Sequence, residues 1–299
     1  MITNYFISPN QQLKPFINNY ILSTSHGEHI SYRSQWPATN EIFLIFYLQD
    51  APLHFTNYQD CLLKDKKSYL ISLLTHYNGS VDFNGVCHTF VIQFKTLGFS
   101  KIFKMPMDVV ADRMYCCNDI LGNVSDCIHE QLQVAKNLLE MAFIADRFLL
   151  SYINKVNPVL SDGLTFVANE INVSSEFLSV GSYASKANMS RRSFERKFSE
   201  QIGISPKRYF RLSRFQNAMK QKLLNPLKKW TSIAHEWGYF DQMHMIKDFK
   251  HFANVNTGDF FHNNDGKTRS PINLFESDLA IFERLNTNLS NEKFVYVNR

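Results

Sequence analysis

Residues 182–203 read SYASKANMSRRSFERKFSEQIG, a stretch that predicts two short helices separated by a tight turn. Tyr183-Ala184 opens an apolar face, and the turn is expected over Lys186–Met189. Ser190 suits the N-cap of the second helix, because its hydroxyl can accept an otherwise unpaired backbone N–H. The buried face of that helix recurs at four-residue steps, at Phe194, Phe198 and Ile202. Gly203 stands where a helix commonly stops in the left-handed conformation.

Charged side chains occupy the other faces of this second helix. They are Arg191, Arg192, Glu195, Arg196 and Glu200. A short helix, a turn and a second helix with an arginine-rich front is the layout that places side chains into a DNA major groove. Residues 159–270 carry 17 basic against 10 acidic side chains, whereas residues 1–158 carry 12 against 13. A basic block of this kind suits a polyphosphate partner, and a solvated basic surface is the alternative.

The same layout recurs further along the chain. Ser205-Pro206 is expected to cap and begin a helix of about 19 residues, and Asn225-Pro226 closes it. Thr231–Phe252 then reads TSIAHEWGYFDQMHMIKDFKHF, with Gly238 in the turn and Asp241 as the cap. The predicted buried face of this second unit consists of Met245, Phe249 and Phe252. An internal repeat is a far more specific signal than either copy alone.

Residues from about 160 to 262 resemble the DNA-binding domain of the AraC/XylS family of bacterial transcription regulators. The positions that match the family pattern at its spacing are Ala184, Ser190, Arg196, Phe198, Gly203, Ser205, Pro206, Arg214, Ala218, Ile233, Ala234, Gly238, Tyr239, Asp241, Phe249 and Lys250. The resemblance implies that double-stranded DNA is a partner and that the second helix of each unit enters a major groove. It also implies RNA polymerase as a partner and a homodimer as the assembly.

The resemblance assigns base-facing positions to each unit. In the first unit they correspond to Arg192, Glu195 and Arg196, and in the second to Gln242, Met243, Ile246 and Lys247. An arginine can grip guanine with two hydrogen bonds, a glutamate can accept from cytosine, and a glutamine can pair with adenine. Met243 and Ile246 offer apolar contact only. Arg191, Lys207 and Arg208 complete the expected DNA-binding set, with Lys207 expected on phosphate.

Two departures from the family pattern concern the second unit. The family's second Gly-x-Ser/Thr-Pro is replaced by residues 254–257, Asn-Val-Asn-Thr. Asn254 tolerates the left-handed conformation, so the helix stop is expected to survive without the proline. Lys247 stands where the family has arginine, and a lysine cannot grip a base edge bidentately. The alternative for the second unit is therefore that it mainly holds phosphate.

The first 120 residues are expected to form strands. Glu41–Leu48 is a continuous apolar run, typical of a strand buried on both faces. Shorter strands are predicted at Leu53–Tyr58, Tyr69–Leu74 and Thr89–Phe94, separated by turn residues. The pattern suggests a small barrel or sandwich, and the order of elements resembles the cupin-like sensor domains often joined to this DNA-binding domain.

A broad apolar stripe from Ser125 to Ile153 predicts one long helix or two. It is expected to pack on the sheet, with a dimer seam as the alternative. A linker is predicted at Asn154–Gly163, and Phe275–Leu285 has the pattern of a last amphipathic helix. The predicted fold class is therefore α+β, in three parts. These are a β-rich cupin-like domain with a helical appendage over 1–157, an all-α DNA-binding domain over 158–262, and a tail over 263–299 that carries a lid helix.

Other classes of protein find little support in the sequence. No apolar run reaches the length of a membrane span, and the first residues lack the pattern of a secretory signal, so a cytoplasmic location is expected. Five cysteines without regular spacing argue against a disulfide framework or a structural zinc site, although adjacent Cys116 and Cys117 allow a redox pair. Neither a catalytic motif nor a cofactor fingerprint is found. The histidines of residues 1–157 lack the spacing of a cupin metal site, so no metal is expected. They are His26, His29, His54, His76, His88 and His129.

The sequence thus predicts a sequence-specific DNA-binding transcription regulator that is not an enzyme. A small-molecule effector bound in the first domain is the expected control. Two rival hypotheses remain open at this point. One is a cupin-type oxygenase or isomerase that uses DNA binding for autoregulation, and the other is a constitutive DNA-binding accessory protein.

Overall fold

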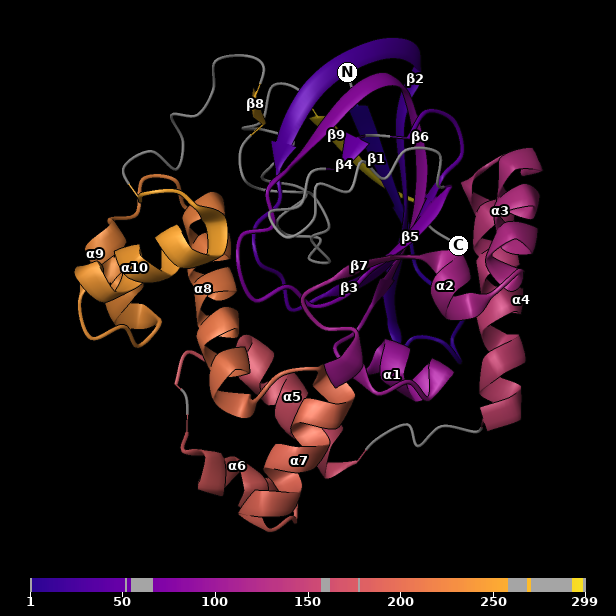
Figure 1. Ribbon diagram of the computed structural model, residues 1–299. Helices are drawn as coiled ribbons and strands as arrows, with labels where there is room; N and C mark the ends of the chain where they lie inside the picture. The colour runs from indigo at the N-terminus through magenta and orange to yellow at the C-terminus, as the bar shows by residue number, and fades with distance from the viewer. Residues whose placement is uncertain are drawn as a thin grey trace.

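The computed structural model describes residues 2–51, 53–54, 67–156, 162–176, 178–257, 268–269 and 292–297. An N-terminal sheet domain with helices on one side precedes an all-helical domain (Figure 1). The strands are β1 (Ile2–Ile7), β2 (Ile17–Gln35), β3 (Ile42–Tyr47), β4 (Leu53–His54), β5 (Ser68–Ile71), β6 (Ser80–Phe94), β7 (Met114–Cys116), β8 (Thr268–Arg269) and β9 (Glu292–Val297). The helices are α1 (Gly98–Phe103), the 3₁₀ turn η1 (Met107–Val109), α2 (Cys117–Leu121), α3 (Val124–Val134), α4 (Leu138–Val156), α5 (Gly163–Val173), α6 (Val180–Lys186), α7 (Arg191–Ile202), α8 (Pro206–Leu224), α9 (Trp230–Glu236) and α10 (Gln242–Ala253). The α+β class predicted from the sequence is confirmed.

The strands form one sheet in the order β7-β5-β3-β6-β2-β1-β9, with β4 paired to β6 and β8 to β2. The long antiparallel pair β2 and β6 lies in the middle of the sheet, and its register shifts between Thr24 and His29. Two residues of that irregularity, His26 and Gly27, have positive φ angles. β1 and β2 were not predicted from the sequence, because polar residues interrupt their apolar pattern. Glycine and turn residues also break the run that forms β2.

The prediction of a strand buried on both faces is confirmed for β3, in which all six residues are buried. Successive side chains of a strand point to opposite faces, and the two faces of β3 belong to different apolar clusters. Ile42, Leu44 and Phe46 pack with α1, α3 and α4, whereas Phe43, Ile45 and Tyr47 pack on the other side of the sheet. The expected strands at 69–74 and 89–94 correspond to β5 and the second half of β6. Of the expected strand Leu53–Tyr58, residues 53 and 54 form β4 and the rest lie outside the described residues.

The apolar stripe of residues 125–153 forms two helices, α3 and α4, with an extended residue, Ala135, after α3. Both helices lie along one side of the sheet domain (Figure 1). Their buried residues include Ile128, Leu132, Met141 and Leu149, so packing on the sheet is confirmed. Phe143, which the sequence pattern places in the stripe, is 60% exposed instead.

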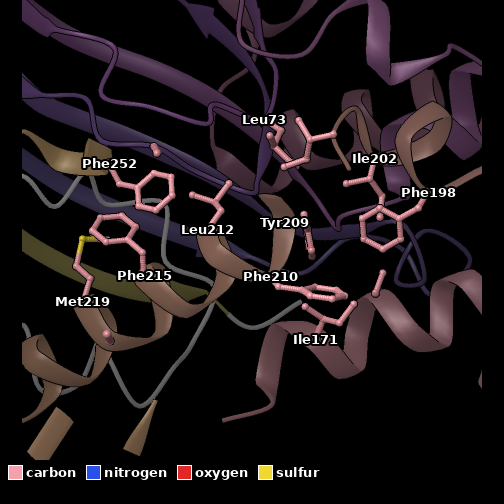
Figure 2. Close-up of a cluster of buried hydrophobic side chains, with 14 of the residues drawn as sticks. Leu73, Ile171, Phe198, Ile202, Tyr209, Phe210, Leu212, Phe215, Met219 and Phe252 are labelled. Carbon is pink, nitrogen blue, oxygen red and sulfur yellow. The ribbon is translucent and has the colours of Figure 1, made fainter. Parts of the chain in front are cut away.

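All six described helices of the second domain contribute aromatic and aliphatic side chains to one core, part of which is drawn in Figure 2. This core continues into the sheet domain, because Ala38, Leu73 and Leu97 belong to the same buried cluster as Phe198, Tyr209 and Phe215. Members of the cluster labelled in Figure 2 are Leu73, Ile171, Phe198, Ile202, Tyr209, Phe210, Leu212, Phe215, Met219 and Phe252. The two domains are therefore packed against each other through apolar contacts.

The lid helix predicted at Phe275–Leu285 lies outside the described residues. The described parts of the tail are strands that the sequence did not predict. β9 pairs in parallel with β1, from Ile2 opposite Glu292 to Ile7 opposite Val297, and β8 pairs in parallel with β2.

Candidate nucleic-acid interface

The first helix-turn-helix unit consists of α6 and α7 and forms as its sequence predicts. The Ser190 hydroxyl accepts the backbone N–H of Ser193 at 3.3 Å, which satisfies one of the unpaired donors at the start of α7. Asn188 takes the left-handed conformation in the turn, and Gly203 takes it after the last residue of α7. Phe194, Phe198 and Ile202 are all buried, so the opposite face of α7 points away from the core.

The outward face of α7 carries the residues predicted to contact DNA. Arg191, Arg192 and Arg196 are exposed, and Glu195 is half-buried. Arg191 Nε lies 3.2 Å from Glu195 Oε1, and Arg196 Nη1 lies 3.2 Å from Glu200 Oε2. Pairs of this kind on a helix surface are worth only about 0.3–0.5 kcal/mol. Both guanidinium groups can therefore exchange these partners for bases or phosphates at little cost.

The 19-residue helix α8 joins the two units, which lie at its two ends (Figure 1). At about 1.5 Å per residue it is roughly 28 Å long. The predicted proline start and Asn225 end are confirmed, but Ser205 makes no side-chain capping bond, so that part of the prediction is wrong. The first turn of α8 thus relies on the fixed backbone angle of Pro206 and not on a serine hydroxyl.

Two arginines of α8 hold the second unit in place, a role that the sequence did not reveal. Arg211 Nε lies 2.7 Å from Oδ1 of Asp248, which is buried on α10. The Arg214 guanidinium lies 5.2 Å from the centre of the Tyr239 ring, and its Nη1 donates to the carbonyl of Gly238 at 3.3 Å. Their side chains face α10 and the turn before it.

The second unit consists of α9 and α10. Asp241 caps α10 by accepting the backbone N–H of His244 at 2.7 Å, as predicted. Asn254 follows the last residue of α10 with a φ of 55°, so the expected helix stop without glycine is confirmed. The predicted buried face is also confirmed, at Met245, Phe249 and Phe252.

The four predicted contact positions of α10 differ in exposure. Met243 is 60% exposed. Lys247 is also exposed, whereas Gln242 and Ile246 are half-buried. All four lie away from the buried face, and none is an arginine. The second unit therefore offers a less charged surface than the first.

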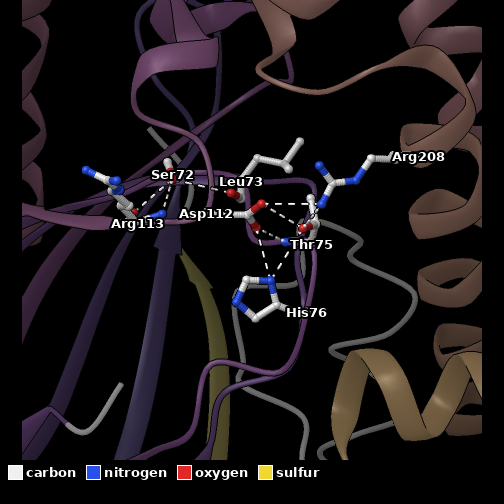
Figure 3. Close-up of polar contacts among 7 residues, drawn as sticks. All are labelled: Ser72, Leu73, Thr75, His76, Asp112, Arg113 and Arg208. Carbon is white, nitrogen blue, oxygen red and sulfur yellow. Dashed lines mark hydrogen bonds and ion pairs between the residues drawn. The ribbon is translucent and has the colours of Figure 1, made fainter. Parts of the chain in front are cut away.

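Lys207 and Arg208 lie at the start of α8 and have different surroundings. Lys207 is exposed, as expected of a phosphate contact. Arg208 points to the sheet domain, where its Nη2 donates to Thr75 Oγ1 at 2.6 Å and lies 3.5 Å from Asp112 Oδ2 (Figure 3). Asp112 Oδ1 also accepts the backbone N–H of Thr75 at 2.5 Å. The same oxygen lies 3.5 Å from His76 Nδ1. Arg208 is thus part of an interdomain contact.

Further polar contacts join the two domains beside the shared core. The Lys101 ammonium donates to Thr165 Oγ1 at 2.6 Å and lies 3.2 Å from Asp162 Oδ2. Burial raises the pKa of Tyr209 on α8 to about 12, and its phenol oxygen lies 3.0 Å from Oγ1 of Thr96 in the sheet domain.

The backbone takes part as well, because Ala38 N donates to the carbonyl of Phe252 at 2.7 Å. Residues at both ends of the helical domain are therefore bonded to the sheet domain.

Within the described residues, no group of three or more histidine, cysteine or acidic side chains could hold a metal ion. Burial raises the pKa of the Cys117 thiol to about 12, which makes that member of the Cys116-Cys117 pair a poor nucleophile. Among the described helices, none has the length and apolar character needed to cross a membrane.

A family model described as a helix-turn-helix domain matches residues 183–263, in agreement with the two units described above. Similar solved structures include ToxT from Vibrio cholerae, at 11% identity and a TM-score of 0.45 over 81% of this chain and 97% of that chain. An AraC-type regulator from Chromobacterium violaceum matches at 26% identity and a TM-score of 0.28, over 29% of this chain and 79% of that one. The DNA-binding domain of AdpA, solved with a target DNA, matches at 26% identity and a TM-score of 0.28, over 30% and 81% of the two chains. No curated protein matches the chain.

Two helix-turn-helix units on a connecting helix, with an exposed arginine face on the first, are the features of a DNA-binding domain. More particularly, residues 183–263 are a helix-turn-helix domain of the AraC type, which confirms the resemblance stated from the sequence.

Proposed function

We propose that this protein regulates transcription by binding a specific DNA site, with α7 and α10 in successive major grooves of one DNA face. The observation that supports the proposal most strongly is the repeated unit itself. Both units carry a capped second helix with a buried inner face, and a single rigid helix joins them. The roughly 28 Å length of α8 is close to the roughly 34 Å that separate successive major grooves.

Within the first unit, we assign base reading to Arg192 and Arg196, with Glu195 beside them. Arg192 and Arg196 are exposed on the outward face of α7, where a bidentate grip on guanine is geometrically available. Lys207, one helix further on, is assigned to phosphate. Arg191, the first residue of α7, is assigned to phosphate as well, because contacts to the DNA backbone commonly flank the base-reading positions.

Replacement of Arg192 tests this assignment. If Arg192 reads a base, Arg192→Ala should cost about 1–3 kcal/mol at the cognate site and relax the preference at one position. The matched control is Lys207→Ala, which should weaken binding to all DNA sequences alike. It should also reduce the number of counterions released on binding, which the salt dependence of the affinity measures, by about one. Selection of bound sites from random DNA measures both effects. Base preferences identical in wild type and Arg192→Ala would refute the assignment.

The sheet domain is proposed to regulate this activity by binding a small-molecule effector. The protein is proposed to act by binding DNA and not by catalysis. Support comes from the contacts of the sheet domain with both ends of the helical domain, through Arg208 at one end and Phe252 at the other. A ligand that alters the sheet domain would therefore alter the setting of both units. Screening of small molecules for a change in DNA affinity tests the effector. An affinity that no ligand shifts would favour a constitutive accessory protein.

A further inference from the structure

The turns of the two helix-turn-helix units are closed by equivalent backbone hydrogen bonds. In the first unit, Met189 N donates to the carbonyl of Ala184 at 2.9 Å. In the second unit, Tyr239 N donates to the carbonyl of Ala234, also at 2.9 Å. Met189 and Tyr239 are therefore equivalent positions. Tyr239 belongs to the core of the helical domain, and Met189 packs against that core.

After these equivalent positions the second unit contains one additional residue. In the first unit, Ser190 follows at once and caps α7. In the second unit, Phe240 stands between Tyr239 and the cap of α10, Asp241. Phe240 thus has no counterpart in the first unit, and the fold of the repeat does not account for its side chain.

Phe240 points into solvent, with 92% of its surface exposed. An apolar residue before the N-cap commonly packs onto the fourth residue of the helix. Here that fourth residue, Met245, is fully buried, and Phe240 does not cover it. The neighbours of Phe240 are fixed on both sides, because Tyr239 is buried under Arg214 and Asp241 is bonded to the backbone of His244. The phenyl ring is thus held outward by a well-ordered turn.

The surroundings of Phe240 indicate DNA as the occupant of this surface. Met243, in the first turn of α10, is 60% exposed and extends the apolar surface of Phe240 along the helix. Lys229, Lys247 and Lys250 of the same unit are exposed, and none of these three has an acidic partner among the described residues. Apolar side chains at the leading end of a recognition helix, among lysines that attract phosphate, fit the floor of a major groove.

We propose that Phe240 and Met243 contact the 5-methyl groups of thymine, so that the second unit selects thymine by apolar contact. Among the four DNA bases, thymine alone carries a methyl group on its major-groove edge, and phenylalanine is one of the side chains that contact it. The residues at the N-terminal end of a recognition helix are those that reach base edges. This inference rests on the proposed function and adds Phe240 as a specificity-determining residue.

The test compares thymine with uracil, which differ only in that methyl group. Selection from random DNA with the full-length protein first supplies a bound site. Duplexes are then made in which each thymine of that site is replaced, one at a time, by deoxyuridine. Wild type should lose about fourfold in affinity at each contacted thymine, the factor that corresponds to burial of one carbon group. Those positions should cluster in one half of the site.

The Phe240→Ala variant should bind the thymine duplex more weakly and should no longer distinguish thymine from uracil at one of these positions. The matched control is Phe166→Ala, because Phe166 is 57% exposed on α5 in the same domain. This control should keep the full discrimination, and circular dichroism should show that both variants are folded.

The outcomes separate this inference from the function on which it rests. If the selection returns no preferred sequence, the proposed function fails. If a site is found and Phe240→Ala discriminates thymine from uracil as wild type does, the thymine contact is wrong while the function stands. A Phe240→Ala variant with unchanged DNA binding and lost transcriptional output would assign Phe240 to a protein partner and would likewise overturn the inference.

Discussion

At the scale of single residues, the two side chains of the ion pair between Arg211 and Asp248 differ in their exposure to solvent. The Arg211 side chain is 45% exposed, whereas that of Asp248 is 1% exposed. A charge that water already reaches tolerates the loss of its partner, but a buried charge without a partner is strongly destabilising. The two residues should therefore respond differently to replacement, although they take part in the same contact.

We expect Arg211→Ala to lower the free energy of unfolding by about 2–4 kcal/mol, because it leaves a buried carboxylate unpaired. Asp248→Asn should cost less, about 1–2 kcal/mol, because the amide oxygen can still accept a hydrogen bond from Arg211. Urea unfolding of both full-length variants measures the two values. A larger loss in Asp248→Asn than in Arg211→Ala would contradict this explanation.

The residues predicted correctly from the sequence are those whose role is set by their chain neighbours. Ser190 and Asp241 cap helices through bonds to the backbone three residues on, and Asn254 ends a helix through its own backbone angle. Arg208 and Arg211 have partners in distant parts of the chain, namely Asp112 and Asp248. No local pattern indicates such partners, so neither contact could be predicted from the sequence.

At the scale of elements, α8 both separates the two units and holds the second. Whether α8 sets the rotation of the second unit relative to the first can be tested by insertion of one alanine after Gln221. The insertion turns the second unit by about 100° about the helix axis. Specific affinity should fall towards that of one unit alone, while weak binding through unchanged charge persists. A four-residue insertion nearly restores the phase but adds about 6 Å, so only partial recovery is expected.

Thermal unfolding must accompany the insertion experiment, because Gln221 also contacts the second unit. Its Nε2 donates to Glu236 Oε1 at 2.7 Å, so an inserted residue disturbs packing as well as phase. A one-residue insertion that stays folded and protects a full-length DNA site with unchanged affinity would show that α8 does not set the spacing.

Helices and strands were predicted best where the apolar pattern of the sequence continues without interruption along the whole element. β3 and α8 have such runs and were found at nearly the expected bounds. β2 was not predicted, because its 19 residues contain a register shift and polar residues that pair with β6 across the sheet. β9 depends on a partner strand almost the whole chain away.

At the scale of the whole molecule, the domains are joined by groups that titrate in acid. Burial would raise the pKa of Asp162, but hydrogen bonds from Thr165 and the charge of Lys101 lower it below its ordinary value. A carboxyl with a lowered pKa stabilises the folded state above its unfolded pKa of about 3.9. That contribution disappears as the pH falls through the lower, folded value.

Lys101→Met should therefore flatten the acid part of the stability profile. It keeps most of the buried side-chain length and removes the charge that lowers the pKa of Asp162. Near pH 6 the variant should be less stable than wild type, and the difference should shrink below about pH 4. Urea unfolding between pH 3 and pH 6 measures this. A difference between the two proteins that does not change with pH would rule out the ionic contribution.

The pairing of β9 with β1 has a consequence for how the protein is made. The ribosome produces residues 2–7 long before residues 292–297, which complete one edge of β1. At about 5–20 residues per second, β1 waits roughly 15–60 s for this neighbour. During synthesis its open edge can pair with other nascent chains, as unpaired strands readily do. Stalled or prematurely terminated translation should therefore yield aggregates even when the DNA-binding helices are already complete.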